Sequence, residues 1–218
     1  MKLRQYRKAT GYYQGSSTRS PNGAVETCSP AFPFLVKTPG WHRTMSKELA
    51  SSITYEWTEI GLWTQDRRDH SSILICQISD SCRTGLAETV RESLLTTSPE
   101  IPASQPFGWH AFILPHVSHS FYVAGWACRD LIREVETRRG HVTQQQTDYT
   151  ALHEISRHAM HSTETLLMAV EVIRSTLDDL DEVHAASGPL SQQCKEVRNV
   201  LRCQNSLLQC DHGRSNAL

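Results

Sequence analysis

The segment from Leu152 to Leu180, LHEISRHAMHSTETLLMAVEVIRSTLDDL, decides the fold class. Most of its apolar residues recur every three or four positions, which is the spacing of one stripe along a helix. The stripe consists of Leu152, Ile155, Ala159, Ser162, Leu166, Val170, Ile173, Leu177 and Leu180. We expect one helix from about Asp148, a suitable N-cap, to the stop signal Gly188-Pro189. A helix of that length spans ~55–60 Å, so it predicts an antiparallel helix pair or a coiled coil.

Helices are also predicted before and after this segment. Upstream, a stripe begins after His116, and Pro115 lies inside a longer, kinked helix that begins near Phe107. The upstream stripe consists of Val117, Phe121, Ala124, Cys128, Leu131 and Val135. The downstream stripe consists of Leu190, Cys194, Val197, Leu201 and Leu208. Because its pattern weakens after Gln209, we expect this last helix to fray there.

The region from residue 53 to 80 has the composition of β-structure. β-Branched and aromatic residues fill Ile53 to Trp63, and Ile73 to Ile78 is an apolar run of strand length. The polar stretch Thr64 to Ser72 is longer than a tight turn, so we expect an antiparallel hairpin with an open loop. A short helix follows and ends at Ser98-Pro99. Its apolar face consists of Leu86, Val90 and Leu94.

These elements predict an α+β fold that is dominated by helices. A small antiparallel β-hairpin or sheet packs with helices, and a long antiparallel helical hairpin extends it. The expected units are a low-order tail (1–45), a small α/β core with the kinked helix (46–145), the helical hairpin (146–210) and a frayed tail (211–218). Proline, glycine and serine are dense in the first tail, where the apolar patch Ala31 to Val36 suits docking as an extended segment.

Composition and charge argue against several functions. The chain has 218 residues, with 22 lysines and arginines against 23 aspartates and glutamates, so nucleic acid is not an expected partner. No window approaches the ~18 apolar residues of a membrane-spanning helix, and no apolar stretch follows the basic start, so we expect a cytoplasmic protein. The seven cysteines form no C-x-x-C pair. We expect reduced, mostly buried thiols, with Cys128, Cys194 and Cys203 at or near apolar helix positions.

Motifs for nucleophilic catalysis and nucleotide binding are absent from the sequence. It contains no G-x-S-x-G elbow, no G-x-x-x-x-G-K-[ST] and no G-x-G-x-x-G, so we do not expect an enzyme. Glu154, His158 and His161 nevertheless lie at i, i+4 and i+7, within about 60° of one another on a helix. Such ligands suit Zn²⁺ or another divalent ion, and the alternative is a solvated polar face with a Glu-His pair.

An acidic run is the second candidate metal site. It consists of Asp178, Asp179, Asp181 and Glu182. The run lies near the C-terminal end of the predicted long helix, where the helix dipole disfavours negative charge. Clustered carboxylate oxygens suit a hard cation such as Mg²⁺ or Ca²⁺, and the alternative is a solvated helix face.

Two segments carry a resemblance to a known family. Trp126 to Glu136 contains W-x-x-R-D-x-x-R-x-x-E, and Leu152 to Leu166 contains L-H-x-x-x-R-H-x-x-H-x-x-E-x-L. Together with the order of the expected elements, these segments resemble the soluble N-terminal domain of CorA-like divalent-cation transporters, especially their divergent fungal branch. The resemblance covers roughly residues 53 to 208.

The resemblance implies an α/β core with long helices, assembled as a pentamer in which magnesium between subunits favours the closed state. It places the acidic run toward the tip of the helical hairpin, and it makes Leu190 to Gln209 the start of the stalk helix. The family's two membrane helices and Gly-Met-Asn signature do not occur between Met1 and Leu218. We therefore expect no pore from this chain by itself.

Three functional interpretations stay open. The first is a non-enzymatic CorA-like domain that self-associates in response to regulatory Mg²⁺, without transport. The second is a metal-independent helical interaction module whose stripe pairs with another protein. That stripe consists of Leu166, Val170, Ile173 and Leu177. The third is a histidine-based metalloenzyme at Glu154, His158 and His161.

Overall fold

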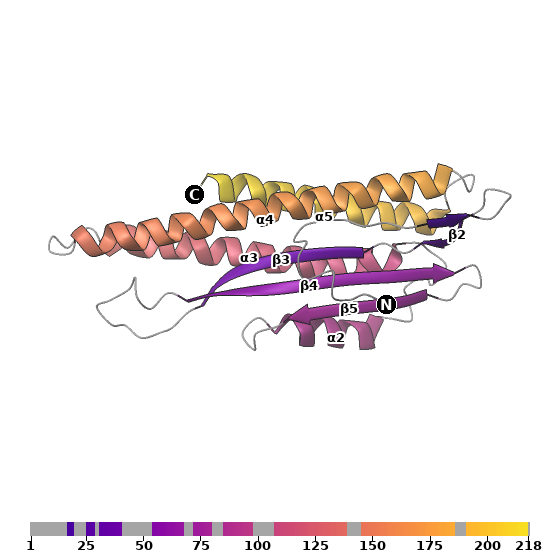
Figure 1. Cartoon of the computed structure of the whole chain (residues 1–218), viewed down its shortest axis with the longest axis horizontal. Helices are drawn as coiled ribbons and strands as arrows, with labels where there is room; N and C mark the ends of the chain where they lie inside the picture. Colours follow the sequence, from indigo (N-terminus) through magenta and orange to yellow (C-terminus); the bar gives the residue numbers. More distant parts are fainter. Residues whose placement is uncertain are drawn as a thin grey trace.

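The structure is a computed structural model that describes residues 17–19, 25–28, 31–40, 54–67, 72–79, 85–97, 107–138, 145–185 and 191–217. It confirms the α+β, helix-dominated fold class, in which a small antiparallel sheet packs against helices. The long helices lie side by side along the long axis of the molecule, next to the sheet (Figure 1). None of the described helices combines the length and the apolar character needed to cross a membrane.

The sheet is built around one long central strand. Its strands are β1 (Ser17–Arg19), β2 (Val25–Cys28), β3 (Ala31–Gly40), β4 (Thr54–Arg67) and β5 (Ser72–Ser79). β3 and β5 flank β4 in antiparallel register, with Phe34 opposite Ile60 and Ile60 opposite Ile78. Because alternate residues of a strand face opposite sides, these three side chains share one face of the sheet. β2 pairs with the end of β4, and β1 pairs with β2.

The predicted helices are present, and the last two form the predicted antiparallel hairpin. They are α2 (Leu86–Thr97), α3 (Gly108–Arg138), α4 (Gln145–Ala185) and α5 (Gln192–Asn216). Asp181, near the end of α4, pairs with Arg198, near the start of α5, at 2.6 Å. At the other end of the pair, the hydroxyl oxygens of Thr163 and Ser215 lie 2.8 Å apart. α4 and α5 therefore run in opposite directions along each other.

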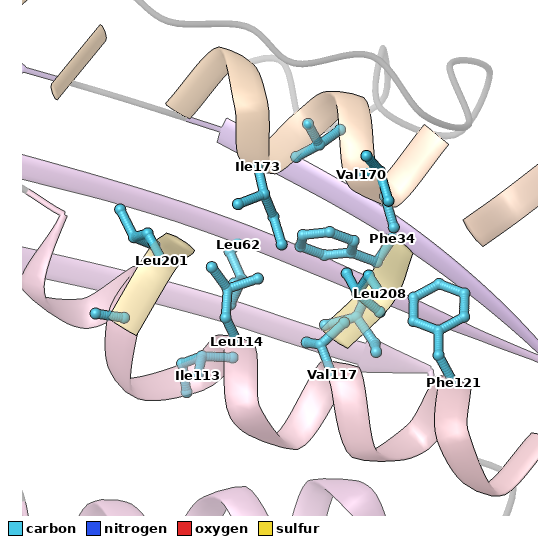
Figure 2. Packing of buried hydrophobic residues seen from close by; sticks show 14 of the residues in the cluster. Phe34, Leu62, Ile113, Leu114, Val117, Phe121, Val170, Ile173, Leu201 and Leu208 are labelled. Carbon is cyan, nitrogen blue, oxygen red and sulfur yellow. The ribbon is translucent and has the colours of Figure 1, made fainter. Parts of the chain in front are cut away.

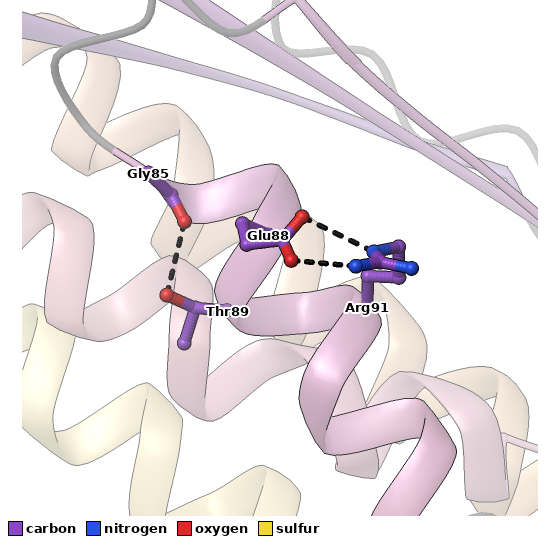
Figure 3. Close-up of polar contacts among 4 residues, drawn as sticks. All are labelled: Gly85, Glu88, Thr89 and Arg91. Carbon is purple, nitrogen blue, oxygen red and sulfur yellow. Dashed lines mark hydrogen bonds and ion pairs between the residues drawn. The ribbon is translucent and has the colours of Figure 1, made fainter.

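The start of α2 depends on a glycine. Gly85 has a φ of 59°, in the left-handed region that favours glycine, and its carbonyl accepts bonds from both the backbone N–H and the hydroxyl of Thr89. One turn into the helix, Arg91 pairs with Glu88 at 2.6 Å (Figure 3). That pair is fully exposed, so it adds little to stability. Leu86 and Val90 are buried as predicted and attach α2 to the core.

One hydrophobic core joins the sheet to all four described helices. Side chains from β3, β4, α3, α4 and α5 point toward a common interior in Figure 2. Its members include Phe34, Leu62, Ile113, Leu114, Val117, Val170, Ile173, Leu201 and Leu208. This cluster therefore draws on both predicted units, 46–145 and 146–210, and a second, smaller cluster consists of Leu131, Val135 and Ile155. The junctions at residues 46–53 and 139–144 lie outside the described residues.

The prediction of a low-order tail over residues 1–45 is wrong for β1, β2 and β3. β3 is a ten-residue strand that contacts both α3 and α4. Pro33 and Pro39 are tolerated there because β3, among the described strands, pairs with β4 alone and so has a free edge. The expected docking of Ala31 to Val36 as an extended segment is confirmed, since Phe34 and Val36 enter the core, whereas the pairing of β3 with β4 was not predicted because β4 is distant in sequence. The rest of the predicted tail lies outside the described residues.

Three smaller expectations also need correction. The predicted fray from residue 211 is wrong because α5 continues to Asn216 and buries Ser215 against α4. The open loop is shorter than predicted, since β4 continues to Arg67 and pairs Asp66 with Ser72 of β5. Cys128 and Cys194 are buried as expected, whereas Cys203 is exposed. The stop signal at residues 188–189 lies outside the described residues.

Candidate functional site

The predicted trio of Glu154, His158 and His161 lies on the side of α4 that faces β3 and β4. The rings of His158 and His161 are 6.3 Å apart, and Glu154 Oε2 is 3.7 Å from His158 Nε2. The i, i+4, i+7 spacing therefore does bring these side chains to one face, as predicted. We call the trio, with the strand residues that contact it, the polar cluster. The strand residues are Lys37, Tyr55 and Trp57.

His158 is the buried centre of the polar cluster. Its ring stacks on Tyr55, with centroids 3.2 Å apart and planes at 22°, and the residue is 7% exposed. Burial, followed by the charges of Lys37 and Arg157, lowers the pKa of His158 to about 4. Its Nδ1 atom and the Tyr55 hydroxyl are buried without a hydrogen-bond partner. His158 is therefore neutral at pH 7 and held mainly by ring packing.

Lys37 reaches the polar cluster from β3. Its Nζ lies 3.2 Å from Nδ1 of His161, 4.7 Å from the ring centre of Trp57 and 5.3 Å from that of Tyr55. The residue is only 6% exposed, and burial, followed by the charge of Arg157, lowers its pKa. Aromatic faces attract a cation, so the two rings offset part of the cost of removing the ammonium group from water.

Cationic side chains contact two members of the trio. Glu154 accepts a 2.5 Å bond from Arg157, and the His161 Nδ1 atom already contacts Lys37. Two of the trio's donor atoms, Glu154 Oε2 and His161 Nδ1, therefore have cationic partners, which oppose a bound metal ion. Among the residues that the structure describes, no group of three or more His, Cys, Asp or Glu side chains is placed to hold a metal ion.

The acidic run spreads around α4. Asp178, Asp181 and Glu182 are exposed and Asp179 is partly buried. At about 100° per residue, Asp178, Asp181 and Glu182 fall within about 100° of one another, whereas Asp179 lies about 160° from Asp181. Asp181 is paired with Arg198 of α5. The four carboxylates therefore do not converge on one point within a single chain.

The sequence matches no protein-family model. Comparison with curated proteins likewise finds no match. The resemblance to CorA-like transporters stays a prediction, and the sites are interpreted from their own geometry.

The polar cluster contains acid–base side chains, and solvent scarcely reaches two of them, Lys37 and His158. Lys37 and His158 are both more than nine-tenths buried, so a substrate has no direct approach to either group. The contacts instead join β3 and β4 to α4, and this is a structural role. Sequence reasoning missed Lys37 because it assigned residue 37 to a tail. A lysine directly after the apolar patch at 31–36 is the one local signal, and it is weak.

The outer faces of the long helices carry large apolar side chains. On α3, Tyr122 and Trp126 contact each other edge to face, and Arg129 lies over the Trp126 ring at 4.4 Å. Among the described residues, the exposed large hydrophobics outside the long helices are Trp57 and Leu95. Those on α3, α4 and α5 are Tyr122, Val123, Trp126, Tyr149, Met160, Leu167, Met168 and Leu207. Most of these positions lie opposite the apolar stripes on which the helix predictions rested.

The stripe predicted to pair with another protein is occupied by the chain's own core. Leu166, Val170 and Ile173 are at most 3% exposed, and Leu177 packs against the same cluster. A helix in a single-core fold turns its strongest apolar stripe inward. That stripe is therefore not exposed to a partner in this structure.

Proposed function

We propose that this chain is a non-enzymatic protein that works through protein–protein contacts made by the outer faces of its long helices, with a second copy of the chain as the partner. The observation that carries the proposal is the set of large apolar side chains on the outer faces of α3, α4 and α5. Tryptophan, tyrosine and arginine dominate the binding energy of protein interfaces. Trp126, Tyr122 and Arg129 supply all three on one helix.

Two further points support an interaction role over catalysis. The side chains suited to acid–base chemistry, Lys37 and His158, are buried in contacts that hold the fold together. Self-association is also the form of contact that the resemblance to CorA-like soluble domains implies. In that family a divalent cation regulates the assembly, so the acidic run belongs in the test.

Sedimentation velocity of the full chain over a micromolar concentration series tests the proposal. We expect the average mass to rise above that of the monomer as the concentration increases. A mass that stays monomeric across the series, both with EDTA and with millimolar Mg²⁺, overturns the proposal. The matched control is a chain with Asp178, Asp179 and Asp181 each changed to Asn.

The two forms of the proposal predict different results in that experiment. If Mg²⁺ drives the wild type to associate and the triple variant does not respond, the acidic run regulates the contact. If both proteins associate equally with EDTA and with Mg²⁺, the contact is independent of metal. Because the acidic side chains do not converge within one chain, a regulatory cation would have to bind between copies.

A further inference from the structure

α5 carries a second stripe on its outer face, turned by about 120° from the stripe that it buries. The inner stripe consists of Cys194, Val197, Leu201, Gln204 and Leu208. The outer stripe consists of Glu196, Val200, Cys203, Leu207, Cys210 and Arg214. Its positions step by 4, 3, 4, 3 and 4, and at about 100° per residue they fall within about 80° of one another. This is the spacing with which one helix packs against another.

The middle of the outer stripe is exposed and apolar. Leu207 is 49% exposed, and the thiols of Cys203 and Cys210 are exposed. Val200 is partly buried where the stripe meets the core. Free cysteine packs as a small hydrophobe, so these four positions can bury against a neighbour. An acid and a base, Glu196 and Arg214, close the two ends of the stripe.

We infer that a second copy of this chain packs on the outer stripe of α5 with its own α5 running antiparallel. The inference rests on the proposed function. It places the contact between copies on the outer stripe of α5 and assigns the register of the two helices. A two-fold axis beside residue 205 places Glu196 against Arg214 of the second copy, and Arg214 against the second copy's Glu196. The same axis pairs Val200 with Cys210 and Cys203 with Leu207. The stripe is therefore complementary to itself, as a two-fold interface requires.

Charge distinguishes this arrangement from a parallel one. A parallel pair brings Glu196 against Glu196 and Arg214 against Arg214, and like charges that meet at an interface are unfavourable. In the antiparallel pair, opposite charges face each other at both ends of the stripe. Arg214 contacts Asp211 at 3.0 Å within its own helix, with 64% of its side chain exposed, so exchanging that partner costs little. Glu196 accepts from Gln192 at 3.2 Å, an exposed contact of the same kind.

The size of the stripe predicts a weak dimer. From Glu196 to Arg214 the helix rises ~27 Å, which is short for a stable protein interface. We therefore expect a concentration-dependent equilibrium between monomer and dimer. Aromatic side chains on α3 lie on another helix and are not part of this contact.

Charge reversal on α5 tests the register. We expect Glu196→Arg alone or Arg214→Glu alone to weaken dimerisation by roughly tenfold, because each creates two like-charge contacts. The combined variant, Glu196→Arg with Arg214→Glu, restores both attractive pairs and should regain most of the affinity. Lys195→Glu, on the same helix but off the stripe, is the matched control. Additive loss in the combined variant overturns the antiparallel register.

Engineered cysteines test independently whether the two α5 helices are antiparallel. In a Cys210→Ser background, Leu207→Cys should form a disulfide between position 207 and Cys203 of the second copy under mild oxidation. Adding Cys203→Ser should abolish that cross-link. A cross-link that persists without Cys203 and maps to position 207 of both copies shows that the helices are parallel. If the chain associates but neither test gives the expected result, the proposed function stands and this interface is wrong. If the wild type stays monomeric, both the proposed function and this interface are wrong.

Discussion

At the scale of single residues, the polar cluster shows how tertiary contact changes the chemistry of ordinary side chains. Lys37 and His158 are both nearly buried, and both have lowered pKa values because burial penalises their charged forms. The charge of Lys37 also opposes protonation of His158. Tyr55 fills the space beside them, and its pKa is raised mainly by burial. Hydrophobic contact and ring stacking therefore hold this polar set in place more than hydrogen bonds do.

Replacing the buried ammonium group should change the titration of its neighbour. In Lys37→Met we expect the pKa of His158 to rise above about 4, because one of the charges that oppose its protonation is gone. It should stay below the usual value, since burial is the larger cause. NMR titration of the imidazole resonances measures the change. Lys195→Met, on α5, is the control, and an unchanged pKa in Lys37→Met contradicts the charge coupling.

Acid should destabilise the fold through His158. The pKa is about 4 in the folded state and ~6.5 in the unfolded state, so protons bind the unfolded chain better. The contribution of His158 to the free energy of unfolding is fully present above pH 6.5. It is lost as the pH falls toward 4, and the loss is roughly 2–3 kcal/mol. Four charged or titratable side chains face His158, namely Lys37, Arg157, Glu154 and His161.

Urea unfolding at neutral and acid pH checks this pH dependence. In His158→Gln the difference in unfolding free energy between the two pH values should be smaller than in the wild type. His153→Gln, which changes an exposed histidine on the same helix, should leave the difference as it is. If the difference between the two pH values is the same in all three proteins, His158 does not contribute to the pH dependence of stability.

At the scale of elements, β3 decides how the sheet meets the helices. Its even-numbered residues Phe34 and Val36 enter the core, and Lys37 enters the polar cluster beside α4. The strand is at the free edge of the described sheet, so contacts with α3 and α4 cover much of it. An edge strand covered by helices is protected from pairing with another chain. A segment with the composition of a tail thus becomes a structural part of the fold.

Alanine substitutions at two adjacent positions test the attachment of β3. Phe34 is 4% exposed, so Phe34→Ala should lower the free energy of unfolding by about 3–5 kcal/mol. Leu35 is partly buried on the other face, and Leu35→Ala should cost clearly less. Chemical denaturation of the two variants measures the difference. Similar small effects at both positions would mean that β3 is not part of the core.

At the scale of the whole molecule, buried apolar side chains hold the helices to the sheet, and we propose that the outer helix faces make the contacts with a second copy. The inner stripes of α3, α4 and α5 are buried in one large cluster and one small cluster, and the opposite faces carry exposed apolar side chains. Met168 on the outer face of α4 is 40% exposed, whereas Ile173, little more than one turn along, is fully buried. The two roles are thus separated around the circumference of each helix.

This separation predicts that two apolar residues of α4 respond differently to truncation. Ile173→Ala should lower the free energy of unfolding by about 2–5 kcal/mol, because it leaves a cavity in the shared core. Met168→Ala should change it by less than about 1 kcal/mol. Thermal or urea unfolding of both variants provides the comparison. If Ile173→Ala weakens association and leaves stability unchanged, its stripe faces a partner and the core assignment is wrong.

The sequence by itself determined the elements whose signal is local. The 3.6-residue periodicity predicted α3, α4 and α5, and it correctly identified residues such as Val117, Ile173 and Leu201 as core. Strand composition predicted the β4–β5 hairpin, and helix geometry correctly placed Glu154, His158 and His161 on one face. These patterns are readable because each depends on residues that are neighbours along one element.

Only the tertiary structure decided which distant segments meet. β3 has few local strand signals, and it is ordered by hydrogen bonds to β4 and burial against α3 and α4. Lys37 acquired its partners in the same way, and they turned a candidate metal trio into a buried polar contact. Cys203 fits an apolar pattern, yet it lies on the outer stripe because α3 and α4 cover the other side of α5. The periodicity of apolar residues shows that a helix has two different faces, but only tertiary packing determines which face is buried.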